Sequence, residues 1–403
     1  MPRILLLAAI LAAAIPAGAS SPVSDTTRAG IDVSVSPDPG GFISTYKGLG
    51  IGVTVTIDNL GWTGSELILN SQIMTRHGQY SAFLFSADPF EARVYAAGGI
   101  RYEGCRALGF SGLGPRSQVD DRQGVVVRRI EVEAGVGWYP LAGRRLLVQP
   151  VVRFLHDNVR AFDDFDPEAF MRLDEASRES LVRALGEPSY GFTFGPEFVL
   201  DFTDEPRHPR RGALASVSVR QYEGLDDDAF RYTSGTASLH GFLPTFSRRH
   251  VLEARAVLAI TRESADRPVP FYALQTVDAD LIGGYPPFRL VGRDLLALSL
   301  GAKFPLFDVF NWIGLEGELV FHAANVYDNV FDQFQPAIDF RRDLARGDGA
   351  APLRPALTIG GHIMDLGDGR PMLSGQLGLS PEGFQLATLD FAIDLRARRP
   401  FVR

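Results

Sequence analysis

The sequence contains little of what marks several common classes of protein. Its one cysteine, Cys105, excludes an internal disulfide and is either a free thiol or an incidental small apolar residue. Nearly all of the 40 basic residues are arginines, since Lys47 and Lys303 are the only lysines, and they form no dense run. With a formal net charge of −8, this composition argues against nucleic acid as a partner.

Signatures of enzymes and metal sites are missing as well. The seven histidines are scattered without an H-E-x-x-H pattern, so we expect no metal site and no other cofactor. Gly109-Phe110-Ser111 begins like a nucleophile elbow, but Leu113 stands where the G-x-S-x-G pattern requires glycine. We therefore expect that the protein is not an enzyme.

Long apolar runs are missing except at the amino terminus. Arg3 precedes an apolar run over Ile4–Ile15, and small residues follow up to Ala19, which predicts a signal peptide over residues 1–19 and export. No other stretch reaches the about 18 apolar residues that a spanning helix requires. We expect a short lead over residues 20–29, and the exported chain is periplasmic, extracellular or an outer-membrane barrel.

What the sequence does contain is a two-residue rhythm of apolar side chains. Every second residue of Tyr190–Phe202 is apolar, and in Leu295–Phe304 leucines alternate with small, polar or cationic residues. This period is typical of strands with two different faces. Several of these stretches exceed the usual soluble strand of about five or six residues and match the roughly nine to eleven that cross a bilayer at a tilt.

The rhythm recurs along the whole chain and predicts about sixteen strands. They are expected over Gly30–Pro37, Gly48–Ile57, Glu66–Met74, Tyr80–Ala87, Ala92–Glu103, Val125–Tyr139, Arg145–His156, Tyr190–Phe202, Ala213–Tyr222, Tyr232–Phe242, Val251–Thr261, Leu295–Phe304, Ile313–Ala323, Ala356–Met364, Met372–Leu379 and Phe384–Leu395.

The connections between these strands alternate between short and long. In a membrane barrel, short periplasmic turns alternate with longer extracellular loops, and an even strand number returns the chain to its starting side. A soluble sandwich would bury the apolar faces instead, but it gives no reason for this alternation. Because hydrocarbon offers no water to backbone groups, only helices and closed barrels cross a membrane. We therefore predict an all-β fold, a transmembrane antiparallel β-barrel over residues 30–403.

One long connection, Asp157–Ser189, carries a helix signal. Asp166 is a suitable N-cap and Pro167 suits the first turn, which predicts a short helix there.

Several segments resemble the bacterial surface antigen barrel of the BamA/TamA outer-membrane superfamily. An acidic turn that ends in Pro-x-x-Gly resembles the family's strand–turn–strand motif, with Asp201, Asp204, Pro209 and Gly212 in its positions. A second segment resembles the family's sixth extracellular loop, through Ile282, Gly283, Gly284, Tyr285, Arg289 and Arg293. Asn59–Gly64 and Asp88–Phe90 fit the family's first two periplasmic turns.

The resemblance implies an inserted sixth loop, a place in the Gram-negative outer membrane, and contact with outer-membrane lipids. Because the chain shows no POTRA repeats, with which the family's assembly factors hold client strands, we expect an accessory or scaffold in outer-membrane biogenesis. A periplasmic or outer-membrane protein partner stays open. The alternatives are a passive solute channel and, less favoured, an enzyme that acts on lipids.

Two departures from the family concern the inserted loop. Gly283 stands where the family has an arginine that reaches acids on the barrel wall, and Gly301 stands where it has an acidic residue. We expect Arg289 or Arg293 to replace the missing cation and Glu316 and Glu318 to supply the acids.

The strand parity also places charges of both signs on the inner face of the barrel. This mixture favours an ion-pair network over a selective pore. The predicted lumen network comprises Glu131, Glu133, Arg145, Arg153, Arg220, Glu253, Arg255, Lys303, Glu316 and Glu318.

Overall fold

The computed structural model describes residues 34–44, 48–58, 65–75, 78–87, 94–141, 145–161, 165–186, 188–204, 209–225, 230–247, 249–263, 268–277, 281–309, 313–345, 349–366 and 370–392. The expected signal peptide and the lead lie outside these residues, as do the turn motifs over 59–64 and 88–90.

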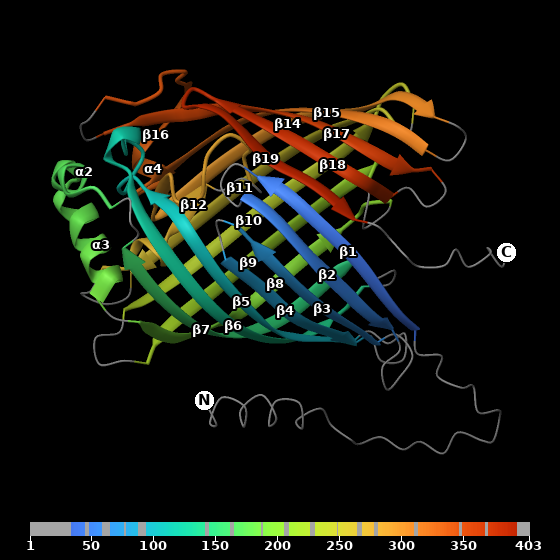
Figure 1. Ribbon diagram of the computed structural model, residues 1–403, viewed down its shortest axis with the longest axis horizontal. Helices are drawn as coiled ribbons and strands as arrows, with labels where there is room; N and C mark the ends of the chain where they lie inside the picture. Colours follow the sequence, from blue (N-terminus) through green and yellow to red (C-terminus); the bar gives the residue numbers. More distant parts are fainter. Residues whose placement is uncertain are drawn as a thin grey trace, which may run out of the picture.

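Sixteen strands form the barrel within the described residues (Figure 1). They are β1 (Ser34–Ser44), β2 (Gly48–Asp58), β3 (Ser65–Met74), β4 (Gly78–Ala87), β5 (Val94–Phe110), β6 (Gln123–Trp138), β7 (Leu146–Ala161), β8 (Ser189–Asp201), β9 (Gly212–Gly224), β10 (Arg231–Pro244), β11 (Val251–Glu263), β14 (Asp294–Val309), β15 (Ile313–Tyr327), β17 (Ala351–Asp365), β18 (Arg370–Ser380) and β19 (Gly383–Ala392).

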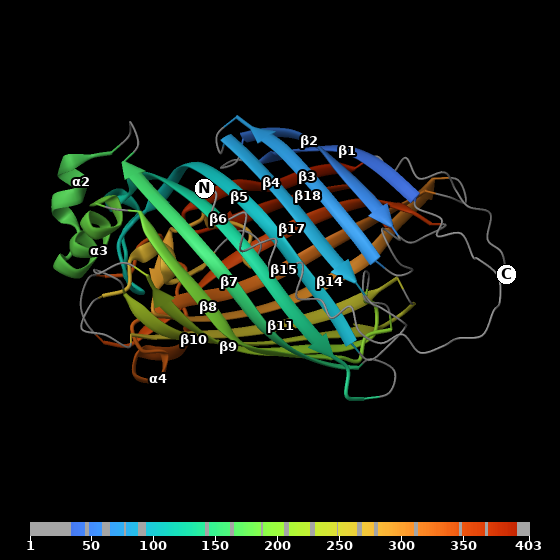
Figure 2. The same ribbon diagram turned by 90° about the horizontal axis from the view of Figure 1, so that it is seen from below.

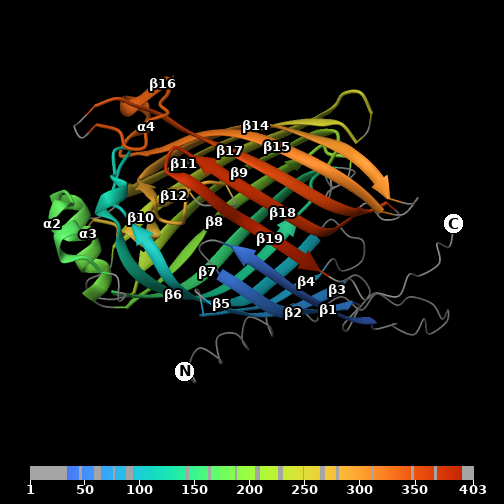
Figure 3. The ribbon, with the colours of Figure 1, turned by 45° about the horizontal axis from the view of Figure 1, so that its top comes forward.

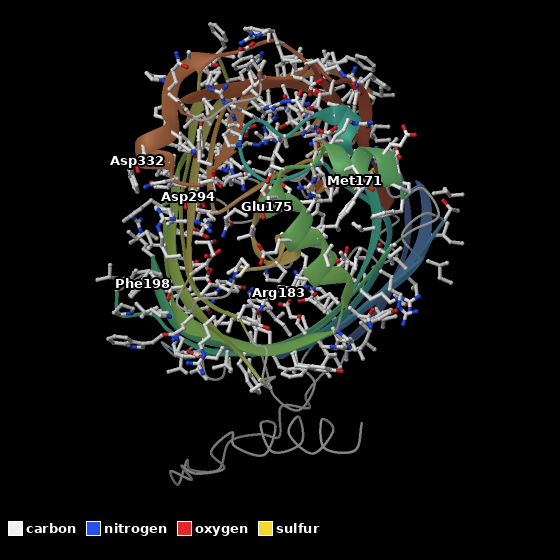
Figure 4. The ribbon with its side chains drawn as sticks, turned by 90° about the vertical axis from the view of Figure 1, so that its left-hand side faces the viewer. Met171, Glu175, Arg183, Phe198, Asp294 and Asp332 are labelled. Carbon is white, nitrogen blue, oxygen red and sulfur yellow. The ribbon has the colours of Figure 1, made fainter. Side chains whose placement is uncertain are left out.

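Each barrel strand pairs antiparallel with the barrel strands before and after it. The last strand, β19, returns to pair with β1, from Gly40↔Ala392 to Ile43↔Leu389, which brings the sheet back to its first strand. Seen end-on, the strands form a ring (Figure 4). The predicted antiparallel barrel is therefore confirmed, and each of its sixteen strands overlaps one expected from the sequence.

The two faces of the wall follow the predicted parity. On β8, Phe194 and Phe198 are exposed on the outside, and Figure 4 shows Phe198 pointing away from the ring, whereas Thr193 is buried on the inner face. On β15, Leu319 and Phe321 face out. The outer surface is thus apolar along the strands, as a hydrocarbon environment requires.

The longer connections between barrel strands gather at one end of the barrel and contain short helices and strands (Figures 1 and 2). They are the helices α2 (Pro167–Arg172), α3 (Glu175–Gly186) and α4 (Val330–Gln333), the 3₁₀ turns η2 (Val119–Asp121) and η4 (Phe271–Ala273), and the short strands β12 (Gln275–Val277), β13 (Leu290–Gly292) and β16 (Phe334–Ile338). We refer to this end as extracellular and to the end with the short turns as periplasmic, following the orientation that the loop lengths predict for a membrane barrel. None of the helices in the described ranges is long and apolar enough to span a membrane.

The predicted helix is two helices. The Asp166 side chain accepts a hydrogen bond from the Glu168 amide at 2.9 Å, with Pro167 in the first turn, as expected. The first helix then ends, and a second one starts because the Asp174 carboxylate accepts a hydrogen bond from the Ser177 amide at 2.8 Å and so caps α3.

The β5–β6 hairpin reaches further than expected. A bulge between Cys105 and Leu108 interrupts its ladder, which then continues to Phe110↔Gln123. Phe110 is fully buried there, and its ring lies 4.6 Å from that of Phe271. Packing against another loop, which no local pattern reveals, extends these strands beyond the point where their alternation ends.

Candidate functional site: the sixth loop and the lumen

The segment between β11 and β14, which we call loop six, enters the extracellular end of the barrel. Its described parts are residues 268–277 and 281–293, and β12 pairs with β13 within it from Gln275↔Gly292 to Val277↔Leu290. Ile282, Tyr285 and Leu290 are buried in one cluster with residues of β11, β14, β15 and β17. Loop six is therefore part of the core, as the resemblance implied.

The tip of loop six lies directly against the barrel wall. A side chain at Gly283 would place its Cβ 2.4 Å from the Thr358 hydroxyl, and one at Gly378 would lie 2.2 Å from the Gly284 amide. Gly284 also has a φ of +108°, and its carbonyl accepts from the Ser380 hydroxyl at 2.9 Å. A side chain at position 283 would not fit this approach unless Thr358 moved.

Arg289 fixes the loop through a buried charge cluster. Its Nη2 lies 2.7 Å from Oε1 of Glu382, in the β18–β19 turn, and its Nε donates to Oε2 at 2.9 Å. Arg354 of β17 contacts the same carboxylate at 3.5 Å, and both arginines are only 1% exposed. We call Arg289, Arg354 and Glu382 the latch, because a carboxylate of the β18–β19 turn joins loop six to β17.

Neighbouring groups complete the latch. Arg289 also donates to the Ser117 hydroxyl at 2.8 Å and to the Ser117 carbonyl at 3.1 Å, and it lies 3.5 Å from Asp343. Burial raises the pKa of Glu382 more than the two guanidinium groups lower it, and burial also raises the pKa of Tyr285. The latch is therefore a desolvated site, in which each buried charge needs its oppositely charged partner to offset the cost of its burial.

The expected partners of the loop-six arginines were wrong. Arg289 pairs with Glu382 and Asp343, and Arg293 pairs with Glu263 at 3.1 Å. Glu316 and Glu318 belong to other ion pairs, nearer to the periplasmic end.

The inner wall carries separate charge clusters instead of one network. Arg153 pairs with Glu133 and, at 3.5 Å, with Glu131. Arg220 pairs with Glu197 at 3.1 Å, an acid that the sequence analysis did not single out.

A second set lies on β11, β14 and β15. Lys303 contacts Glu253 at 3.0 Å and Glu318 at 3.7 Å. A side chain at Gly301 would come within 2.9 Å of the Glu253 side chain, so Glu253 of the neighbouring strand fills the space beside Gly301. Glu318 also contacts His362 at 2.9 Å.

The remaining predicted network residues have varied surroundings. Glu316 pairs with Arg210 at 3.2 Å and with Arg249 at 3.0 Å, which ties two periplasmic turns to the wall. Arg255 lies opposite Ser299 in the β11–β14 ladder. Arg145 is not in the lumen: it precedes the first residue of β7, and its guanidinium lies 5.4 Å from the ring centre of the outward-facing Phe202. The strand alternation on which its placement rested does not extend to this residue.

The Asp-rich motif forms the β8–β9 turn. Asp201 accepts from the Thr203 amide at 2.8 Å, and Asp204 accepts from the amides of Arg210 and Arg211 at 2.9 and 3.0 Å. Pro209 lies in the irregular segment of the turn, and Gly212 ends it with a φ of +105°.

Helix α3 lies across the extracellular opening (Figure 4). Arg183 on this helix donates to the Pro268 carbonyl of loop six at 2.9 Å. A cavity of about 760 Å³ is lined by residues of α2, α3, loop six and the β5–β6 loop. Its charged lining residues include Arg172, which pairs with Asp121 at 3.0 Å. No group of three potential metal ligands occurs in the described part of the chain.

Sequence reasoning missed two of the three latch residues, Glu382 and Arg354. Glu382 stands in a tight hairpin turn, where an acidic side chain is usually solvated, and Arg354 lies near the start of a strand. No spacing in the sequence links either residue to Arg289, which lies 93 residues before Glu382.

Comparisons with protein-family models and with curated protein sequences give no match. The structure is similar to that of BamA from Haemophilus ducreyi lacking POTRA domains 1–3, with a TM-score of 0.60 and 16% identity, covering 90% of this chain and 70% of that one. It is also similar to CdiB from Acinetobacter baumannii, with a TM-score of 0.51, 9% identity, and coverage of 89% and 60%. For CdiB from Escherichia coli, the TM-score is 0.53 at 9% identity, with coverage of 89% and 63%.

These likenesses concern the fold. The expected BamA-type barrel is confirmed at that level, and the chain spans less than two thirds of either CdiB chain.

Proposed function

We propose that this chain, which has the barrel fold of BamA and CdiB, is an outer-membrane protein that serves as an accessory or scaffold in outer-membrane biogenesis. The proposal includes a protein partner, periplasmic or in the outer membrane, and no catalytic step. Lipid hydrolysis that disappears on Ser111→Ala would instead support an enzyme.

The observation that carries the proposal is the seam between the first and the last strand. Its described ladder runs from Gly40↔Ala392 to Ile43↔Leu389, and it is the one place where the described barrel strands pair across the two ends of the sequence. Pro37 and Pro39 of β1 have no amide hydrogen to donate, and proline is typical of strand edges. We infer that this seam, where β1 lacks two amide donors, is where a strand of another protein can pair with the barrel.

The filled mouth supports a scaffold over a passive channel. Loop six occupies the extracellular end of the lumen, where Ile282 and Leu290 are fully buried, and α3 lies over it. A passive channel requires an open path along the axis, which this arrangement does not favour.

A disulfide across the seam tests the proposal. The test variant combines Gly41→Cys with Phe391→Cys, two positions that pair in register, in a Cys105→Ala background. The matched control combines Thr236→Cys with Ala259→Cys, which pair in the β10–β11 ladder.

A strain that lacks the protein should show reduced levels of outer-membrane proteins. The control variant should restore them, and the seam-locked variant should restore them only after reduction. Normal levels in the deletion strain, or full complementation by the oxidised seam variant, would refute the proposed role.

A further inference from the structure

The loop between β15 and β17 folds over the outside of the barrel. We call its described residues 328–345 the flap, which contains α4 and β16. Figures 2 and 3 show α4 beyond the ring of strands, and Figure 4 shows Asp332 on the outer side of the wall. Val330 and Leu344 of the flap are buried against Leu258 and Leu296. These two leucines belong to the outward rows of β11 and β14, so the flap covers a part of the lipid-facing surface.

Polar contacts hold the flap in this position. The Val330 amide donates to Asp294 at 2.9 Å, and Asp294 is fully buried beside Arg262. At its other end, Arg342 pairs with Asp120 at 2.7 Å. The flap is therefore held at one end by the wall strand β14 and at the other by the η2 turn of the β5–β6 loop.

The height of the flap follows from the strand beneath it. On β14, the outward row runs from the covered Leu296 through the exposed Leu298 and Leu300 to the exposed Leu306. Ten residues at about 3.3 Å each, tilted by about 40°, span about 25 Å, which equals the apolar band of an outer-membrane barrel. If Leu306 marks the periplasmic edge of the band, the flap begins at its extracellular edge.

The exposed surface of the flap carries four large apolar side chains among its polar ones. Phe331 is 73% and Phe340 is 69% exposed, and Phe334 and Ile338 of β16 are also exposed. Such a group of large apolar side chains on one short segment marks an interaction surface. Within the flap, four aspartates oppose two arginines, so the charge does not favour anionic headgroups.

We propose that the flap is a lipid-binding surface that inserts Phe331 and Phe340 at the boundary between the headgroups and acyl chains of the outer leaflet. The surface is continuous with the lipid-facing wall and lies at the height where aromatic side chains gather in membrane barrels. Because apolar burial drives the insertion, it does not depend on lipid charge or ionic strength.

Site-directed spin labels test the proposal in reconstituted barrels. Phe331→Cys and Phe340→Cys are made one at a time in a Cys105→Ser background and placed in neutral phosphatidylcholine vesicles. Leu300→Cys on the wall is the lipid-exposed control, and Met171→Cys, on the exposed side of α2, is the water-exposed control. Accessibility to oxygen reports on hydrocarbon, and accessibility to a water-soluble nickel complex reports on solvent.

Labels at positions 331 and 340 should favour oxygen over the nickel complex, as at position 300, and should give the same ratio in low and high salt. Nickel accessibility like that of position 171 would overturn the proposal. Dipolar broadening between labels of two barrels would overturn it as well, because a second copy would then occupy the surface. Since the proposal does not depend on the role in biogenesis, a normal deletion strain leaves it standing, whereas a water-exposed label at position 300 would refute the barrel itself.

Discussion

Removing the carboxylate of the latch should release loop six. Glu382→Ala leaves Arg289 and Arg354 buried without their shared acid, and the loss of one partner of a buried ion pair costs about 3–5 kcal/mol. At about 1.4 kcal/mol per factor of ten, opening of the loop becomes about a hundred to several thousand times more frequent. The barrel strands should remain paired, because their ladders do not involve this side chain.

Limited proteolysis with trypsin measures this opening, since both loop-six arginines remain as cleavage sites. Mass spectrometry should show cleavage after Arg289 at a rate that rises by the same factor, if the loop closes faster than it is cut. Glu382→Gln, which keeps an acceptor oxygen but not the charge, should give a smaller increase. Glu263→Ala, which removes the partner of the half-exposed Arg293, should change the rate by only a few-fold, as a surface ion pair of about 0.2–1 kcal/mol implies. A Glu382→Ala rate equal to that of the wild type would refute the latch.

Three further expectations concern other parts of the molecule. Gly212→Ala should cost about 1–3 kcal/mol, because the residue has a φ of +105° and the new Cβ would lie 2.1 Å from a carbonyl oxygen. The variant barrel should unfold at a lower temperature in SDS gels. Gly241→Ala, whose Cβ meets nothing within 4 Å, should leave that temperature unchanged. Phe194→Arg on the lipid-facing wall should destabilise the barrel in urea by about 2–4 kcal/mol, and a loss near zero would argue against a hydrocarbon environment. Hydrogen bonding to Arg341 lowers the pKa of Asp339 to about 2. The ionised carboxylate should therefore stabilise the fold above pH 3.8, and this contribution should be lost as the pH falls through about 2. A carbon-13 NMR titration, assigned with Asp339→Asn, that gives an ordinary pKa would contradict this.

The barrel was predictable because its period is local. A strand such as β8 alternates between lipid and lumen along its whole length, and that rhythm is visible in Tyr190–Phe202 without any knowledge of its neighbours. The β8–β9 turn was equally readable, because Asp201, Asp204 and Gly212 act on backbone groups within a few residues. Among the predicted lumen residues that the structure describes, the parity failed at Arg145, where the strand has not yet begun.

The latch and the flap were not predictable, because they depend on contacts between distant parts of the chain. Glu382 reaches Arg289 only after the barrel has brought the β18–β19 turn over loop six. The flap covers Leu296, which in sequence belongs to a row of lipid-facing leucines. The short pair β12 and β13 and the edge strand β16 also form through neighbours, over three to five residues that carry no periodicity of their own.

The central claim is a membrane-spanning barrel whose mouth is closed by loop six, and planar-bilayer conductance tests it most directly. The wild-type protein is compared with a variant in which Ile282–Arg289 is replaced by a short Gly/Ser linker. We expect only rare, brief openings from the wild type and steady currents from the variant. Steady open-pore current from the wild type, or no membrane insertion by either protein, would contradict the claim.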